Sequence, residues 1–359
     1  MQAYIKSTCV ISPQHTHSAE GFPAEIREVV SNRLSCEEPE YKTLISPLQL
    51  RRMPRILKMG LAASQLCINR AGGVNPDGII VGTGLGCLDN LEKFLLEVLD
   101  NHEHVTSVLP FINSTHNAVA AQVAMLLKNH NYNVTYCHRA FSFESAMLDA
   151  LMLLQEKQAH HVLVGGIDEC TSDFVHLHSY LGQWKEPLSN LQLFSEKSPG
   201  TIAGEGSAFF MLSDEPPGND NDVRISGIHT FLTSTPCDIN EVMHEADIFL
   251  EKCQLRRQDL DTVMLGMNGD SERDGIYHQL MEQYFTDTTS FLYYKHLCGE
   301  YYTSSAFALW LASVVLQSRS IPDVVSFKSR PLHSPENLLI YNQHQNTEHS
   351  LILLNYGRL

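Results

Sequence analysis

The distribution of apolar and polar residues predicts a strand, a tight turn, a buried helix and a second strand in the middle of the chain. Residues 141–154 are rich in Ala, Leu and Met, and only Glu144 and Asp149 interrupt their apolar face, a pattern typical of a buried helix. Before them, β-forming residues surround Val134. After them, residues 162–166 form a short apolar run that ends in two glycines, as a buried strand does. We therefore expect this unit to lie in the core.

Similar patterns predict further elements on both sides of this unit. The expected strands are residues 4–11, 78–86 with a glycine turn at the end, 132–136, 208–212, 224–229, 262–266, 290–293, 338–341 and 351–354. The expected helices are residues 47–70, 117–127, 239–252 and 304–317. Ser46 followed by Pro47 is a typical start for the first of these helices, with serine as the N-cap.

Other segments are expected to separate these elements. Residues 109–115 should cap the following helix through Ser114 or Thr115. The segment directly after Glu169 is expected to be rich in loops. Residues 216–222, with the sequence PPGNDND, have the composition of a linker. This linker would divide the chain into an N-terminal half, residues 1–215, and a C-terminal half, residues 223–359.

Composition and charge exclude several classes of function. With 43% apolar and 18% charged residues among 359, the sequence is that of a globular protein with a large core. The formal charge of −16, without a basic stripe, argues against binding to nucleic acid or to an anionic membrane surface. No segment has the length and apolar character of a membrane span or a signal peptide. We therefore expect a cytoplasmic protein.

Cysteine, histidine and glycine usage gives no sign of a metal site or a cofactor. The nine cysteines are scattered and lack C-x-x-C spacing, which favours reduced thiols. The eighteen histidines include no H-E-x-x-H motif. The glycines at positions 82, 84 and 86 lack the G-x-G-x-x-G frame of a dinucleotide site. We expect neither a metal nor a cofactor.

Four segments resemble the β-ketoacyl synthases, the condensing enzymes of the thiolase superfamily. They are residues 45–72, 109–115, 162–169 and 199–212. The resemblance implies an α/β, thiolase-like fold in which two similar βαβ-type halves stack as a five-layer αβαβα sandwich. It also implies a dimer, in which the strand from Asn131 to Arg139 pairs with its counterpart in the other subunit.

The resemblance locates the catalytic positions, and three of them carry residues unsuited to the chemistry. In the family, a cysteine thiolate at the start of the buried helix takes up the acyl group, and two histidines assist decarboxylation. Counting back from the Gly-Gly pair places the cysteine position on Phe141, whose ring cannot attack a thioester. The histidine positions fall on Asn268 and Glu300. The family's lysine, five residues before the second histidine, is retained as Lys295, and we expect a Lys295–Glu300 ion pair.

A fourth departure concerns the last loop, which we place at residues 342–349. In the family this loop is rich in glycine and lends an N–H group to the oxyanion hole. Here it contains no glycine and is shorter. Departures at four functional places predict that the chain does not condense thioesters alone.

Active alternatives remain open. Cys137, four residues before Phe141 and beside His138, would be the displaced nucleophile of an active 3-oxoacyl-ACP synthase, although the helix would then need extra residues. Cys298 lies close in sequence to Lys295, whose charge would lower the pKa of a thiol. A third class is a thiolase-fold protein that binds acyl chains without catalysis.

The family also contains chain-length factors, which resemble ketosynthases but lack the cysteine. The resemblance implies a catalytically silent subunit of this kind, paired with an active β-ketoacyl-ACP synthase in type II fatty-acid or polyketide-like biosynthesis. Aryl-polyene or flexirubin-type pigment synthesis is the more specific expectation. The expected partners are an active ketosynthase in a heterodimer, or a second copy in a homodimer, and an acyl carrier protein. Phe141 would plug the acyl site or gate a tunnel.

Overall fold

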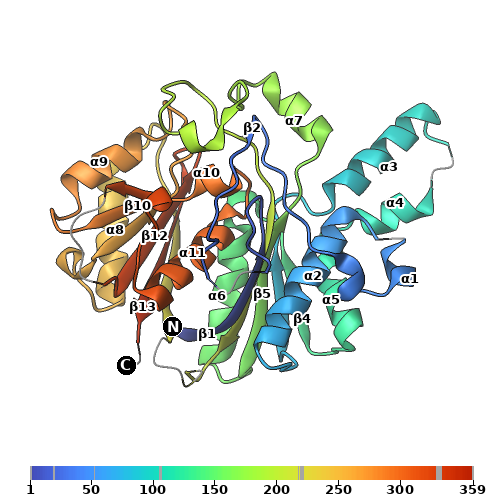
Figure 1. The fold of residues 1–359 in the computed structure, drawn as a ribbon, viewed down its shortest axis with the longest axis horizontal. Helices are drawn as coiled ribbons and strands as arrows, with labels where there is room; N and C mark the ends of the chain where they lie inside the picture. The colour runs from blue at the N-terminus through green and yellow to red at the C-terminus, as the bar shows by residue number, and fades with distance from the viewer. Residues whose placement is uncertain are drawn as a thin grey trace.

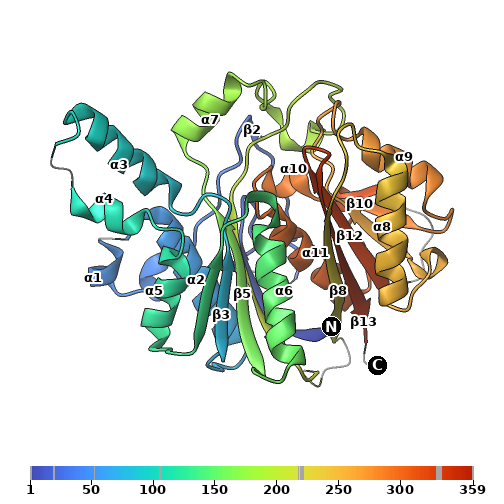
Figure 2. The same ribbon diagram turned by 180° about the vertical axis from the view of Figure 1, so that it is seen from behind.

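The chain folds into five alternating layers of helices and sheets, as expected from its sequence. The computed structural model describes residues 2–18, 21–51, 53–104, 107–216, 218, 222–328 and 334–357. Two mixed sheets lie face to face with helices between them, and further helices cover the outer face of each sheet (Figures 1 and 2). This is the predicted αβαβα sandwich.

The first sheet has the strand order β1-β7-β5-β3-β4. Its strands are β1 (Ala3–Ile11), β3 (Gly78–Gly82), β4 (Tyr132–Tyr136), β5 (His161–Asp168) and β7 (Gly206–Ser213). The strands β5, β3 and β4 are parallel, whereas β7 is antiparallel to both of its neighbours. Within the described part of the chain, β4 pairs on one side only and forms the edge of the sheet.

The second sheet repeats this order and adds a strand. Its order is β8-β13-β12-β9-β10-β11. The strands are β8 (Val223–Leu232), β9 (Thr262–Leu265), β10 (Ser290–Tyr293), β11 (Ser326–Lys328), β12 (Asn337–His344) and β13 (Glu348–Tyr356). When β11 is left out and the remaining strands are numbered within each sheet in chain order, both sheets have the order 1-5-4-2-3. A separate short ribbon is formed by β2 (Val30–Ser31) and β6 (Leu188–Ser189).

The two sheets are joined at one corner into a single hydrogen-bonded sheet. There β1 pairs with β8 through Ala3 with Ile225 and Tyr4 with Arg224. The predicted division at residues 216–222 stays a prediction, because residues 217 and 219–221 lie outside the described part of the chain.

Alternating side chains on the strands generate the layers. On β5, Val164 belongs to the apolar cluster between the sheets, whereas the adjacent Leu163 belongs to the cluster on the outer face. On β12, Ile340 faces the central layer and Leu339 the opposite outer cluster. Because successive side chains of a strand point to opposite faces, each sheet supplies one wall to two cores.

Helices fill the three α-layers. The central layer holds α6 (Ser142–Gln155) and α11 (Ser304–Ser318). The outer layers hold α2 (Arg55–Arg70) with α5 (Ala118–Leu127) and α8 (Ile239–Lys252) with α9 (Gly275–Gln283). The remaining helices are α1 (Pro47–Leu50), α3 (Leu88–Asp100), α4 (Val108–Asn113), α7 (Ser172–Ser179) and α10 (Lys295–Cys298). All residues from 304 to 316 of α11 are buried, which explains why that segment is apolar on every face.

A proline divides the first predicted helix. The expected helix of residues 47–70 is two helices, α1 and α2, with Pro54 as the N-cap of the second. Proline has no N–H group to continue the ladder of α1, so the helix ends before it. Ser46 is the N-cap of α1 as predicted, but its side chain makes no capping hydrogen bond to the backbone.

Two other predicted loops contain regular structure. Residues 108–113 form α4 rather than a cap, and Asn117 is the N-cap of α5. Ser114 instead follows the C-terminus of α4, where its Oγ donates to the Phe111 carbonyl oxygen at 2.8 Å. The segment after Glu169 contains α7, which the Thr171 side chain caps by accepting the Phe174 N–H at 3.1 Å.

Candidate functional site

Glycine and serine set the position of the start of α6. A Cβ atom on Gly82 would lie 2.4 Å from the Ser142 carbonyl oxygen, so glycine is required for the helix to approach β3 this closely. The Ser142 Oγ donates to the Arg139 carbonyl oxygen at 2.7 Å and accepts the His138 N–H at 2.8 Å. Arg139 adopts the left-handed conformation with φ of 47°. The result is a tight turn directly before the helix.

Phe141 occupies the N-cap position of α6 and is 9% exposed. Its ring is stacked on that of His138, with centroids 5.7 Å apart and planes inclined by 9°. A phenyl ring has neither a nucleophilic atom nor an exchangeable proton. The position expected to carry the nucleophile is therefore filled by a stacked pair of rings.

The structure does not give Cys137 the character of a nucleophile. Its Sγ donates to the Gly84 carbonyl oxygen at 3.4 Å. Although the residue is exposed as a whole, desolvation on its inner side and the Asp168 charge raise the pKa of the thiol. A nucleophilic cysteine needs the opposite shift, because the thiolate is the reactive form.

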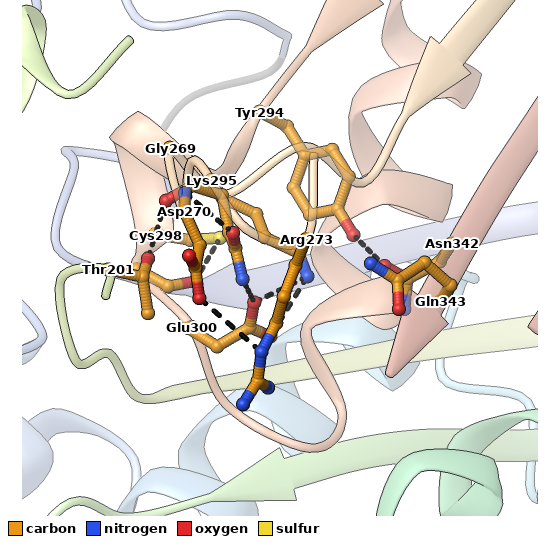
Figure 3. A network of polar contacts seen from close by, with 12 residues as sticks. Thr201, Gly269, Asp270, Arg273, Tyr294, Lys295, Cys298, Glu300, Asn342 and Gln343 are labelled. Carbon is orange, nitrogen blue, oxygen red and sulfur yellow. Dashed lines mark hydrogen bonds and ion pairs between the residues drawn. The ribbon is translucent and has the colours of Figure 1, made fainter. Parts of the chain in front are cut away.

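The two histidine positions and the retained lysine meet in one hydrogen-bonded network. Lys295 Nζ donates to both oxygens of Glu300, at 2.9 and 2.7 Å, and Asn268 Nδ2 donates to Glu300 Oε2 at 2.7 Å. Lys295 is 1% exposed, whereas the Glu300 side chain is 20% exposed. Figure 3 shows the lysine and glutamate side chains directed toward each other. The predicted ion pair is present, and the asparagine belongs to it.

Two glycines fix the backbone at Glu300. A Cβ atom on Gly204 would lie 2.1 Å from the Cys298 carbonyl oxygen, and one on Gly299 would lie 2.5 Å from the Gly204 Cα. This close approach lets the Glu300 N–H donate to the Ile202 carbonyl oxygen at 2.8 Å and lets the Glu300 carbonyl oxygen accept the Gly204 N–H at 2.9 Å. The glycine-rich segment at 200–206 therefore serves to hold the carboxylate.

A buried aspartate orders the loop that carries Asn268. The Asp274 carboxylate accepts the N–H groups of Asn268 at 3.1 Å and Gly269 at 2.8 Å. The Thr201 Oγ1 donates to the Asn268 carbonyl oxygen at 2.6 Å. Burial raises the pKa of Asp274 to about 7. The loop conformation thus depends on a carboxyl group that titrates near neutrality.

The last loop is a tight β-hairpin turn, which corrects the predicted loop of residues 342–349. Strand β12 continues to His344 and β13 starts at Glu348. The Asn346 N–H donates to Gln343 Oε1 at 2.6 Å, and the Thr347 N–H donates to the His344 carbonyl oxygen at 3.2 Å. These two donors are used inside the hairpin and are not free to hold a thioester oxygen.

A cavity of about 160 Å³ opens beside this network. The charged groups of its lining are five carboxylates and one guanidinium, namely Asp168, Glu169, Asp270, Glu272, Glu300 and Arg273. Aromatic groups complete the wall, namely Phe174, Trp184, Tyr301 and Tyr302. Decarboxylative condensation develops negative charge on an enolate and on the thioester oxygen, and a lining with this excess of carboxylates opposes both.

Sequence reasoning missed two residues of the cavity wall that carry reactive groups. His344, at the end of β12, lies with its ring centroid 5.5 Å from that of Tyr302, and burial lowers its pKa to about 4. Cys170 follows β5, and burial raises the pKa of its thiol to about 12. The raised pKa keeps the Cys170 thiol unionised at neutral pH, whereas the thiolate is the reactive form of a cysteine. No sequence motif identifies either residue, because each is brought to the cavity only by the position at which its strand ends.

Cys298 is inert for a related reason. It is fully buried, and burial raises the pKa of its thiol well above the ordinary value, with Lys295 acting in the opposite direction. The prediction that the lysine would leave this thiol with a lowered pKa is wrong. Desolvation raises the free energy of the thiolate by more than the attraction to the Lys295 charge lowers it.

A second buried carboxyl group, Glu144, lies behind the network. It is fully buried in the third position of α6, and its Oε1 accepts the Ser350 Oγ hydrogen at 3.0 Å, which links the central helix to β13. Its Oε2 has no hydrogen-bond partner among the residues that the structure describes. Burial raises the pKa of Glu144 to about 7, against the opposing effect of the Lys295 charge. The carboxyl therefore changes its charge near neutral pH.

Within the described residues, no group of three or more His, Cys, Asp or Glu side chains could hold a metal ion. Likewise, none of the described helices has the length and apolar character needed to cross a membrane.

Comparisons with known proteins agree with this geometry. Residues 13–216, more than half of the chain, match the profile of the β-ketoacyl synthase N-terminal domain. Among curated proteins, none matches the chain by sequence.

Several solved structures share the whole fold. The ishigamide ketosynthase/chain length factor has a TM-score of 0.79 and 12% identity, with 99% of this chain and 98% of that chain covered. The ketosynthase ApeO in complex with its chain length factor ApeC, from Xenorhabdus doucetiae, has a TM-score of 0.70 and 14% identity, with 99% and 98% covered. The type II ketosynthase AntDE with the acyl-carrier protein AntF has a TM-score of 0.72 and 13% identity, with 99% of both chains covered.

Replacing Glu300 by glutamine is expected to destabilise the fold. The change leaves the buried Lys295 ammonium without its carboxylate, which should cost about 3 kcal/mol of the free energy of unfolding in urea. Adding Lys295→Met should recover most of the loss, because an uncharged pair has no buried ion to compensate. Glu272→Gln, on an exposed side chain of the same cavity, is the matched control and should change stability by less than about 0.5 kcal/mol. Equal effects of the two glutamine substitutions would contradict this role of the ion pair.

Glu144 is expected to make stability depend on pH. Its raised pKa means that the folded protein keeps a proton that the unfolded chain loses above about pH 4.5, so stability should fall between about pH 4.5 and 7. Glu144→Gln should remove up to about 3 kcal/mol of that fall. The fall should not vanish, because burial also raises the pKa values of Glu169 and Asp274 to about 7. Urea unfolding at several pH values gives the slope, and an unchanged slope in the variant would disprove the assignment.

Proposed function

The chain belongs to the β-ketoacyl synthase family, and on this basis we propose that it is a catalytically silent, ketosynthase-like subunit of the chain-length-factor kind. It pairs with an active β-ketoacyl-ACP synthase and contributes to the pocket in which the acyl chain is held. Its own thioester site takes no part in the chemistry.

The observation that carries this proposal is the internal pairing of every group at the expected catalytic positions. Asn268 and Lys295 both donate to Glu300, so the amide and the ammonium are already satisfied by one carboxylate. The N-cap of α6 carries Phe141 instead of a nucleophile. Both donors are directed at a carboxylate, and an amide cannot replace an imidazole as a general acid or base.

The proposed setting is type II fatty-acid or polyketide-like synthesis, with aryl-polyene or flexirubin-type pigment synthesis as the finer assignment. Solved relatives of the same fold include ketosynthases with chain length factors and a ketosynthase with an acyl-carrier protein, which supports these partners for this chain. The ketosynthase is expected to pair along β4, the open edge of the first sheet. The carrier protein delivers its acyl group to the active subunit.

Acyl transfer provides the direct test. The purified chain is incubated with acyl- and malonyl-carrier protein, in the absence and in the presence of an active ketosynthase. The mass of each subunit is then measured by intact-mass spectrometry. We expect no acyl adduct on this chain and transfer only to the ketosynthase cysteine. An adduct mapped to Cys137 would overturn the proposal in favour of an active synthase. Retention of acyl chains without an adduct or a partner would favour the acyl-binding alternative.

Phe141 is proposed to limit the shared acyl pocket. Phe141→Ala removes a ring at the start of α6 and should enlarge the space available to the growing chain, so the reconstituted pair should release longer products. Phe327→Ala, on an exposed ring of β11, is the matched control. Mass spectrometry of the released products measures the distribution of product lengths. Identical distributions for the two variants would disprove the gating role of Phe141.

A further inference from the structure

The cavity beside the ion pair has more acidic groups than the neighbouring cations of the chain balance. Two of its five carboxyl groups are paired, Glu300 with Lys295 and Asp270 with Arg273, the latter at 3.4 Å (Figure 3). The three that form no ion pair with another described residue are Asp168, Glu169 and Glu272. Because opposite charges attract more strongly in a cavity than in bulk water, this excess favours a cationic occupant.

Glu169 is a buried acidic group with one oxygen left for an occupant. It follows β5, lines the cavity and is 6% exposed. Its Oε1 accepts the Asp89 N–H at 3.1 Å, whereas its Oε2 accepts no hydrogen bond from the described residues. Burial raises the pKa of Glu169 to about 7. A buried carboxylate oxygen without a donor is unfavourable, and a cation in the cavity would compensate for it.

The other two acidic groups of the lining differ in their surroundings. Asp168 accepts the N–H groups of Gly84 at 2.7 Å and Thr303 at 2.9 Å, so its oxygens are occupied although its charge still acts on the cavity. Glu272 is exposed, and no described residue donates a hydrogen bond to its carboxylate. An occupant would therefore meet one buried and one solvated carboxylate with free oxygens.

Aromatic rings form much of the remaining wall. The ring centroids of Phe174 and Trp184 lie 6.2 Å apart, and Tyr302 belongs to the same lining. The indole N–H of Trp184 donates to the Val175 carbonyl oxygen at 3.1 Å, which fixes the ring. A Cβ atom on Gly84 would lie 2.4 Å from the Tyr302 Cβ, so that side chain packs directly on the turn after β3. Aromatic rings attract cations, and the attraction is stronger where water is excluded.

We propose that this cavity binds a small organic cation, in which alkyl groups surround a charged ammonium nitrogen. The rings contact the alkyl groups and attract the charge, and Glu169 supplies the counter-charge. The volume of about 160 Å³ suits such a ligand, since a cavity of about 150 Å³ holds one benzene molecule. The inference does not rest on the proposed function, because the ligand needs neither a partner subunit nor an acyl group.

Two other kinds of occupant fit the cavity less well. For a metal ion, the carboxyl groups of the lining would have to converge, but no three potential ligands do so in the described part of the chain. Aromatic walls also supply none of the oxygen ligands that hard cations need. An acyl chain would remove the carboxylates from water without compensating their charge. An alkylated ammonium group satisfies both the rings and the carboxylates.

Choline and its neutral isostere provide a test on the native full-length chain. The isostere, 3,3-dimethylbutan-1-ol, has the same shape but carries a carbon atom in place of the ammonium nitrogen. Isothermal titration calorimetry should show that choline binds about tenfold more tightly, because only the cation gains from the rings and the carboxylate.

Tryptophan fluorescence locates the bound choline. The protein contains two tryptophans, of which Trp184 lines the cavity and Trp310 is buried in α11. Choline should therefore change the emission of the Trp310→Phe chain, in which Trp184 is the remaining indole. It should leave the emission of the Trp184→Phe chain unchanged.

Two matched variants separate the carboxylate of the cavity from general effects of charge. Glu169→Gln retains an acceptor for the Asp89 N–H but removes the charge, so choline should bind about tenfold more weakly while the affinity for the isostere stays the same. Glu282→Gln removes the same charge from an exposed position on α9 and should bind choline as the native chain does.

Three results would overturn the inference. They are a failure of the native chain to bind choline, equal affinities for choline and the isostere, and equal effects of the two glutamine substitutions. The first two are measured on the native chain and so do not depend on the folding of a variant. None of them involves acyl transfer, so this inference and the proposed silent role can fail separately.

Discussion

The buried charge of Lys295 is the constraint on which the site depends. An ammonium group removed from water must be matched by a carboxylate, or it destabilises the fold by several kcal/mol. Glu300 supplies that carboxylate, and the close approach of Gly204 and Gly299 leaves its backbone no alternative position. Asn268 then completes the set by donating to the same carboxylate. The residues at the two histidine positions are therefore coupled through one ion pair, and neither can change without affecting the other.

Other buried carboxylates hold the loops around the cavity in place. Asp168 accepts the Gly84 N–H at 2.7 Å and the Thr303 N–H at 2.9 Å, which ties the turn after β3 to the start of α11. Glu205 forms two hydrogen bonds of 2.7 Å with the Arg55 guanidinium and connects α2 to the glycine-rich loop. These contacts hold the loops around the cavity, and none of them involves Phe141 or Cys137. The loop structure therefore does not depend on which residue stands at the expected nucleophile position.

Local patterns in the sequence predicted much of the fold, and tertiary effects decided the rest. The predicted bounds of α8 and β10 agree with the structure, because both segments carry clear periodicity and turn residues at their ends. Helix α7 and strand β11 escaped prediction, since eight and three residues give little periodic signal. At the site, the resemblance, which placed the family's lysine at Lys295 and its second histidine position at Glu300, predicted the ion pair that the structure contains. The approach of Asn268, 32 residues away, and the inward place of His344 follow from strand packing that no local pattern encodes.

The electrostatics of the cavity explain why restoring a cysteine would not by itself restore a condensing enzyme. A carboxylate about 4 Å from a developing oxyanion opposes it by about 4 kcal/mol at the effective dielectric constant of a protein surface. Of the five carboxyl groups in the lining, Glu300 pairs with Lys295 and Asp270 pairs with Arg273 at 3.4 Å, so Asp168, Glu169 and Glu272 make up the excess of acidic groups. The hairpin N–H groups that could offset this charge are used within the turn. A thiolate at position 141 would therefore face unfavourable electrostatics unless the helix start, the ion pair and the hairpin changed together, because all three differ from what thioester chemistry needs.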